Sequence, residues 1–188
     1  QFPDGKQQRF VKGVTLTEIA KAISPNLAKK SIVGSVNNTA TDLTRPILTD
    51  AQIAIYDANS EQGLEVIRHS TAHLLAQAVK RLYPDVNLGI GPVIDNGFYY
   101  DIEMAHTLVP EDLICIEREM KKIVSESLRI VRKEVTREEA KQLFVHDALK
   151  LELLEAIPSD ELIIIYEQGE FYDLCRGPHV SSTKKLQH

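Results

Sequence analysis

The sequence is poor in cysteine, and it contains no long apolar run. Two cysteines among 188 residues, Cys115 and Cys175, cannot form a disulfide framework and indicate reduced thiols. No segment is long and apolar enough to span a bilayer, and neither a signal peptide nor an internal repeat is recognisable. With 43% hydrophobic and 26% charged residues, the composition is that of a globular protein of one or two domains. We therefore expect a folded protein of the cytoplasm.

Positive charge is also scarce. The chain has 22 Lys and Arg against 27 Asp and Glu, a net charge of −5. This balance is not typical of a nucleic-acid-binding protein, so any RNA contact must use a local basic patch. Because the first residue is Gln1 rather than Met, we expect a fragment of a longer protein.

Residues 1–57 carry the signals of a small β-grasp domain. The pattern predicts a hairpin around Asp4-Gly5 with its returning strand at 7–11, and a helix opened by a Thr15/Glu18 capping box and ended by Pro25. Further strands are predicted at 32–36 and 52–56. A sheet crossed by one helix follows from this order. The polar segment 58–63 is the predicted linker.

The remaining residues, 64–188, predict a second domain in which helices pack on an antiparallel sheet, with a possible truncation at its C-terminus. Helices are expected over 64–82 and after Pro110 and Thr136, and a hairpin over 162–175. The whole chain is therefore predicted to have an α+β fold.

The first of these helices carries two histidines one turn apart. Its apolar residues fall on one face at helical spacing: Leu64, Ile67, Leu74, Leu75, Ala78 and Leu82. His69 and His73 lie nearly opposite this face. For this helix alone, two solvent-facing histidines are the simplest interpretation.

A second pair of reactive side chains follows the predicted hairpin. Period-2 alternation places Asp173 and Cys175 on the same face of a strand. Gly177-Pro178 forces a turn that can bring His179 back toward Cys175. A hairpin end that met the histidine helix would gather three imidazoles and one thiol.

Such a group permits two kinds of chemistry. Four nitrogen and sulfur ligands are the number and type that tetrahedral zinc prefers. Without a metal, imidazoles that titrate near neutral pH can orient and deprotonate a water. The thiol would then be a polar contact or a nucleophile.

Three motifs in these regions resemble one family. Residues 68–75 (RHSTAHLL) are similar to the helix motif in the editing domains of threonyl- and alanyl-tRNA synthetases. Residues 90–101 (IGPVIDNGFYYD) and 173–180 (DLCRGPHV) resemble the threonyl branch, in its bacterial form. Residues 1–57 look like the TGS domain at the N-terminus of the same synthetases. The resemblance covers essentially the whole chain.

The resemblance implies post-transfer editing, the hydrolysis of seryl-tRNA(Thr), by a fragment of threonyl-tRNA synthetase that lacks the aminoacylation domain. A threonine site cannot strongly reject serine, because one missing methyl group changes selectivity by only about 1–3 kcal/mol. The catalytic positions carry over to His69, His73, Lys150, Cys175 and His179. The substrate-binding positions carry over to Gly91, Tyr100 and Asp173, with Asp173 expected to bind the α-ammonium group.

The resemblance also implies the cofactors and partners. No cofactor is expected in this fragment, since ATP, magnesium and a catalytic-domain zinc belong to the full-length enzyme. Zinc at His69, His73, Cys175 and His179 is the alternative, as in related alanyl editing domains. The expected partner is the acceptor end of tRNA(Thr) charged with serine, with no membrane. The parent enzyme is expected to be a homodimer through the absent domains and the fragment a monomer.

Phosphate contacts are expected at Lys80, Arg81 and Arg176, although most surface charges are merely solvated. Two other functions stay open: a non-enzymatic β-grasp adaptor with a structural zinc site, and a free-standing deacylase.

Overall fold

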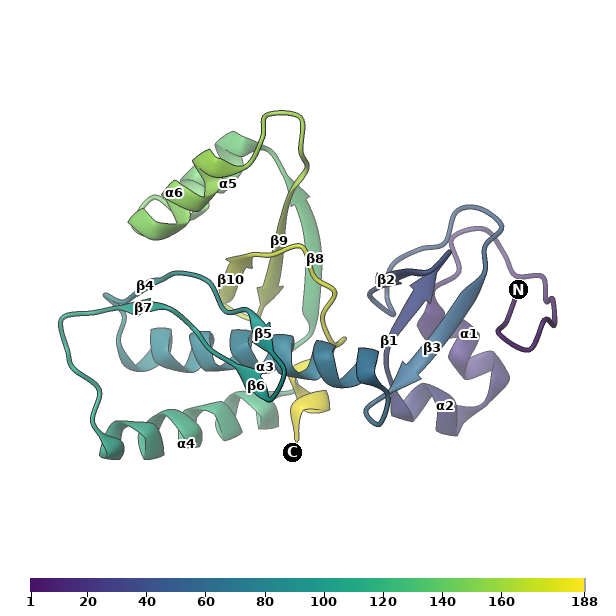
Figure 1. Ribbon diagram of the computed structural model, residues 1–188, viewed down its shortest axis with the longest axis horizontal. Coiled ribbons are helices and arrows are strands. Elements are labelled where there is room, and N and C mark those ends of the chain that lie inside the picture. The colour runs from purple at the N-terminus through teal and green to yellow at the C-terminus, as the bar shows by residue number, and fades with distance from the viewer. Residues whose placement is uncertain (188) are drawn as a thin grey trace. The chain divides into compact units, whose positions relative to one another are not determined.

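The chain divides into two units in the computed structural model, which describes residues 1–187 (Figure 1). One unit comprises residues 1–67 together with 177–181, and the other comprises most of the remaining chain. Helices and antiparallel sheets occur in both, which confirms the α+β class. Within residues 1–187, no helix is both long and apolar enough to cross a membrane.

The first unit contains two short helices and a three-stranded antiparallel sheet with the strand order β2-β1-β3. These elements are α1 (Leu16–Ile23), α2 (Pro25–Lys30), β1 (Ser31–Val36), β2 (Thr39–Thr41) and β3 (Ile53–Asp57).

Local sequence signals explain where these elements begin. The predicted capping box opens α1, where the Glu18 N–H donates to the Thr15 hydroxyl and the Thr15 N–H donates to the Glu18 carboxylate. Pro25 follows the end of this helix, but it is also the first residue of α2, which Ser24 caps. The prediction missed this second helix because proline is as compatible with a helix start as with a helix end.

The core of this unit consists of Leu16, Ile19, Leu43 and Ile53. The predicted hairpin around Asp4-Gly5 forms a turn, but residues 7–11 are not a strand. Phe10 packs against the core, but Val11 is 79% exposed and residues 7–9 are exposed polar side chains, so the segment lacks the alternating apolar face of a strand.

The second unit contains a three-stranded antiparallel sheet with the order β10-β9-β8 and two two-stranded ribbons, β4–β7 and β5–β6. Its helices are α3 (Glu61–Leu82, whose first seven residues group with the first unit), α4 (Pro110–Glu126), α5 (Arg137–Leu143), α6 (Ala148–Ala156) and the 3₁₀ turn η1 (Thr183–Leu186). Its strands are β4 (Asn87–Leu88), β5 (Val93–Ile94), β6 (Gly97–Phe98), β7 (Ile102–Glu103), β8 (Ile130–Val135), β9 (Ile163–Gln168) and β10 (Phe171–Leu174).

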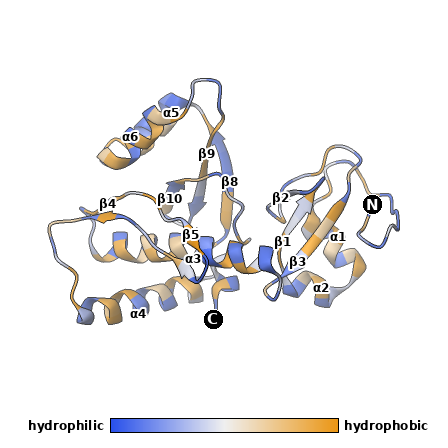
Figure 2. Cartoon of the chain, in the orientation of Figure 1, coloured by the Kyte–Doolittle hydropathy of each residue, from blue (hydrophilic) through white to orange (hydrophobic). Residues whose placement is uncertain are grey.

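Helices α3 and α4 lie side by side (Figure 1), joined where the Tyr83 hydroxyl donates to Asp112 at 2.9 Å. Figure 2 shows hydrophobic and hydrophilic residues alternating along α4, as in an amphipathic helix. Ile116 and Ile123 are its buried residues, while Leu113 and Ile114 are exposed.

The buried surface of α3 only partly matches the predicted face. Leu74 and Ala78 are buried as predicted, but Leu64 and Leu82 at the two ends are 41% and 37% exposed. Ala72, His73 and Ala76, outside the predicted face, are also buried. The interpretation of two solvent-facing histidines is therefore wrong for His73, which is 7% exposed. Alanines beside it allow close packing, and a buried polar side chain is tolerated because partners surround it.

Candidate functional site

The second unit brings His69, His73 and Cys175 together. The two imidazoles come from successive turns of α3, with their centroids 5.3 Å apart and their planes nearly perpendicular. Cys175 directly follows β10, and its Sγ lies 3.2 Å from His69 Nε2. The ligand atoms of the three residues all lie within 4.8 Å of one another. The helix motif and the hairpin motif therefore meet.

Asp173 lies at the centre of a second set of contacts beside this group. Its carboxylate accepts a hydrogen bond from the Tyr100 hydroxyl at 2.6 Å and forms an ion pair with Lys150 Nζ at 2.5 Å. His73 Nε2 is 3.9 Å from the same carboxylate. Lys150 Nζ also donates to the Gly89 carbonyl at 2.6 Å.

The Asp173–Lys150 pair is almost completely buried. Asp173 is 2% exposed and Lys150 is 3% exposed. Removing two charges from water is costly, and breaking such a pair from one side leaves an uncompensated buried charge. An ion pair in this position is more typical of a functional site than of a packing core.

Burial determines the protonation states of two groups near Asp173. Desolvation lowers the pKa of His73 from 6.5 to about 4, outweighing the carboxylate of Asp173, which acts in the opposite direction. Burial, reinforced by Asp173, raises the pKa of the Tyr100 phenol. At neutral pH His73 is therefore a neutral imidazole that can accept a proton, and Tyr100 is a hydrogen-bond donor.

Gly91 lies against the ring of Tyr100. A Cβ atom at this position would be 2.4 and 2.6 Å from two ring carbons, well inside contact distance. The residue must therefore be glycine for Tyr100 to keep its present place. This is the structural role of the predicted substrate-binding residue; its contact with substrate stays a prediction.

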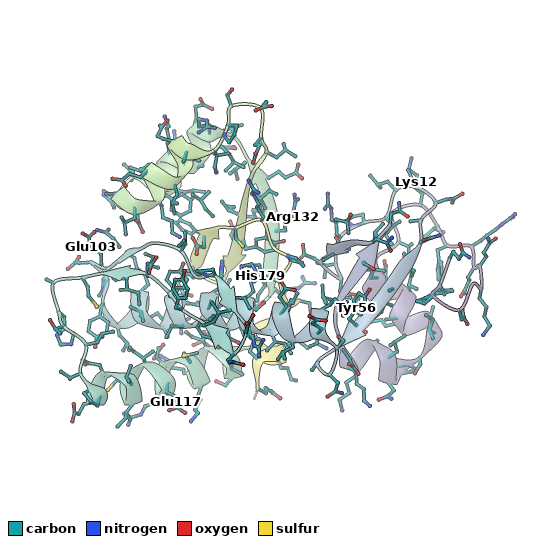
Figure 3. All side chains as sticks on the ribbon, in the orientation of Figure 1. Lys12, Tyr56, Glu103, Glu117, Arg132 and His179 are labelled. Carbon is teal, nitrogen blue, oxygen red and sulfur yellow. The ribbon has the colours of Figure 1, made fainter. Side chains whose placement is uncertain are left out.

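His179 belongs to the segment 177–181, which groups with the first unit. Its backbone N–H donates to Asp42 Oδ1 at 2.8 Å, and the residue is 1% exposed; Figure 3 labels it. Within the second unit, His69, His73 and Cys175 offer two nitrogens and one sulfur, and such donors suit zinc. A role of His179 as a fourth ligand stays a prediction.

The three predicted phosphate-binding residues have different surroundings. Lys80 donates to the Val86 carbonyl at 2.7 Å, and Arg176 is an exposed residue paired with Glu161 at 2.8 Å. The Arg81 guanidinium forms ion pairs with three carboxylates, those of Glu119, Glu126 and Glu170. These carboxylates occupy the nitrogens that a phosphate would need, so we do not retain Arg81 as a phosphate contact.

A polar network that was not predicted from the sequence lies next to the site. Gln77 and Gln168 are buried and bonded to each other, and Gln77 also reaches Glu170. One signal was available: Gln77 and Arg81 continue the four-residue spacing of His69 and His73, so all four lie along one side of the helix.

Two families match the chain. The TGS domain matches residues 1–57, and the threonyl and alanyl tRNA synthetase second additional domain matches residues 163–188. The class is therefore a TGS domain linked to an editing-type domain of these synthetases.

Curated relatives show which of these synthetases the chain is similar to. The chain is 58% identical over 188 residues, 99% of its length, to the threonine–tRNA ligase of Bacillus velezensis and to threonine–tRNA ligase 1 of Bacillus subtilis. It is 52% identical over 187 residues to the threonine–tRNA ligase of Staphylococcus aureus. The chain spans 29% of the length of each. The chain is thus similar to the N-terminal region of bacterial threonyl-tRNA synthetases, which confirms the resemblance found in the sequence.

Proposed function

We propose that this chain hydrolyses the ester bond of seryl-tRNA(Thr), and so removes serine that was attached in error. The buried Lys150–Asp173 ion pair beside the neutral His73 is the observation that carries the proposal. Within one unit, Asp173 offers a binding site for a cation, His73 a proton acceptor and Lys150 an ammonium group. The second additional domain and the threonine–tRNA ligase relatives support the choice of substrate.

Asp173 is the group that would recognise the aminoacyl moiety. Its carboxylate already holds the ammonium group of Lys150, which has the chemistry of a substrate α-ammonium. We propose that the substrate ammonium takes this place on Asp173, and that the displaced Lys150 Nζ turns toward the ester. The Tyr100 hydroxyl keeps the carboxylate oriented through its hydrogen bond.

The neutral His73 would then accept a proton from a water that attacks the ester carbonyl carbon. The carbonyl π electrons move to oxygen, and the Lys150 ammonium stabilises the resulting oxyanion. When the carbonyl re-forms, the bond to the 2′- or 3′-oxygen of the terminal adenosine breaks. That oxygen leaves as a hydroxyl with the proton held by His73. The additional methyl group of threonine would clash with the water or displace it.

Zinc at His69, His73, Cys175 and His179 is the alternative predicted from the sequence, and such an ion would supply Lewis-acid polarisation or structural support. Four protein ligands complete a tetrahedral shell and leave no open position for a water. We therefore propose that side chains alone activate the water. Metal analysis of the purified chain tests this: a stoichiometric zinc ion would contradict it.

The second candidate function is a non-enzymatic adaptor with a structural zinc site, favoured by the close approach of His69, His73 and Cys175 within the second unit. Zinc whose removal unfolds the protein, in a chain that releases no serine, would support this alternative.

The decisive experiment incubates the chain with seryl-tRNA(Thr) and threonyl-tRNA(Thr) and follows ester loss. We expect serine to be released and threonine to be retained. His73→Ala should lower the rate about a hundredfold or more, because general base catalysis contributes on that order. Cys175→Ala should also impair release, while Cys115→Ala, at an exposed cysteine outside the site, should not. Equal loss of both esters, or unchanged rates in both site variants, would contradict the proposal.

The wider biochemical setting is proposed in the same way. The partner would be the acceptor end of serine-charged tRNA(Thr), met in the cytoplasm by a monomeric chain. Ligase activity, with its ATP, magnesium, zinc and dimeric state, would belong to a longer synthetase of the relatives' size.

A further inference from the structure

Four side chains on one side of α3 face the β9–β10 hairpin at four-residue intervals. The first two, His69 and His73, meet Cys175 and Asp173. The next, Gln77, donates from Nε2 to the Gln168 carbonyl at 3.0 Å and to Glu170 Oε1 at 2.9 Å. Gln168 Nε2 donates in return to Gln77 Oε1 at 2.6 Å. The helix is thus bonded to the same hairpin that carries the hydrolytic residues.

Arg81 ends this row of side chains. Its Nε and Nη2 donate to the two oxygens of Glu170, at 2.5 and 3.0 Å. Its Nη1 and Nη2 also hold the two oxygens of Glu126 on α4, each at 2.9 Å. One guanidinium therefore connects α3 to the hairpin turn on one side and to α4 on the other. Paired bonds of this kind fix direction as well as distance.

We propose that Gln77, Arg81, Gln168 and Glu170, which we call the α3–hairpin clamp, are positioning residues for the two histidines. This inference rests on the proposed function. The clamp would hold α3 at one rotation about its axis and the hairpin at one position along it. His69 and His73 would then meet Cys175 and Asp173 at the distances that hydrolysis requires.

The geometry of the two elements explains why such a clamp is needed. A shift of one residue in β10 would turn Asp173 and Cys175 to the opposite face, because side chains alternate along a strand. A rotation of α3 by one residue would turn both imidazoles by about 100°. Apolar packing around the buried alanines of α3 is non-directional, and it distinguishes poorly between such arrangements. The buried Gln77–Gln168 amide pair does distinguish them, since any other register leaves two buried amides without partners.

The test compares Glu170→Gln with Glu126→Gln. Each variant removes one carboxylate charge and one two-oxygen contact with Arg81, but only Glu170 connects α3 to the hairpin. We expect Glu170→Gln to lower the single-turnover rate of serine release by about tenfold to a hundredfold, since small displacements of reacting groups cost that much. We expect Glu126→Gln to stay within about twofold of the parent, with a similar loss of stability. Equal rates in the two variants would overturn the proposal.

A double-variant cycle separates positioning from general stability. In a His73→Ala background Glu170→Gln should lower the remaining rate by much less than it does in the parent, because the residue it positions is gone. A full additional effect would mean that Glu170 acts in another way, and would overturn the proposal.

If the parent chain releases no serine, the proposed function is refuted, but the clamp is not. A measurement that needs no substrate then tests the clamp by itself. In the ¹⁵N-histidine NMR spectrum of the 188-residue chain, Glu170→Gln should move the ring signals of His69 and His73, and Glu126→Gln should leave them in place. Unmoved signals in both variants would overturn the clamp, whether or not the chain is a hydrolase.

Discussion

At the scale of single residues, one carboxylate organises the candidate site. Asp173 contacts a lysine, a tyrosine and a histidine from three different parts of the second unit. Each of these partners would be costly to bury alone, and the carboxylate makes burial of all three possible. Burial strengthens the attraction between the two charges because it excludes water, and it also shifts the pKa values of neighbouring groups.

The first residue-scale prediction concerns His73 and pH. Its pKa is about 4 in the folded chain against 6.5 for an ordinary histidine, so the unfolded chain binds more protons between these values. Its contribution to stability is present above pH 6.5 and decreases as the pH falls toward 4. We expect this histidine alone to reduce the free energy of unfolding by about 3 kcal/mol across that window. Urea unfolding of the parent and of His73→Gln checks this: the variant should lose less stability on acidification. Parallel pH profiles would contradict it.

The second residue-scale prediction concerns the glycine beside Tyr100. Gly91→Ala places a methyl group in steric overlap with the Tyr100 ring, so Tyr100 must move away from Asp173. We expect a loss of about 1–3 kcal/mol in the free energy of unfolding and a slower release of serine. Gly97→Ala is the control, because nothing lies within 4 Å of its added Cβ. Denaturant unfolding and the deacylation assay measure both effects, and equal behaviour of the two variants would refute the close approach.

At the scale of elements, helix ends were the most predictable features. The capping box at Thr136 appears as expected, with the Glu139 N–H donating to the Thr136 hydroxyl and the Thr136 N–H donating to Glu139. It depends on residues three positions apart, so no distant part of the chain is needed to form it. The faces of helices were less predictable, as α3 shows.

This cap yields the element-scale prediction. Thr136→Ala leaves the first N–H groups of α5 without their side-chain acceptor, which should lower the free energy of unfolding by about 1 kcal/mol. Thr107→Ala, at an exposed loop threonine, should change it by less than about 0.5 kcal/mol. Thermal unfolding of the two variants would contradict the prediction if their midpoints fell by the same amount.

At the scale of the whole molecule, the negative net charge limits how the chain can meet a tRNA. Arg81 is surrounded by carboxylates, so its charge is neutralised within the protein. Arg176 is more accessible, with its side chain 84% exposed and a single carboxylate partner. It also directly follows Cys175, so a phosphate bound there would lie close to the candidate site.

The prediction at this scale follows from counterion release. If Arg176 binds a phosphate, Arg176→Gln should reduce the slope of log K against log salt concentration by about 0.7–0.9. Lys121→Gln, on α4 and paired with Glu117, should leave the slope unchanged. Binding of tRNA(Thr) measured at several salt concentrations gives both values. An unchanged slope for Arg176→Gln would remove it from the interface.

Local sequence signals alone were sufficient to predict many of the helices and strands. The helices after Thr15, Pro110 and Thr136, and the hairpin of β9 and β10, all appear near their expected positions. Each is specified by residues close in sequence, through capping, alternation and turn chemistry. Where local signals allowed two outcomes, as for Pro25 or for residues 7–11, the prediction failed. What decides those cases is whether a distant element covers the segment.

By itself, the sequence determined the kinds of reactive group and their spacing: two histidines one helical turn apart, and an acid and a thiol on one face of a strand. Only the tertiary structure decided which groups meet and in what state. Lys150 on α6 pairs with Asp173 on β10. Desolvation lowers the pKa of His73, and three carboxylates pair with Arg81. The physical reason is that spacing along a chain sets direction, whereas distance and desolvation depend on residues far away in sequence.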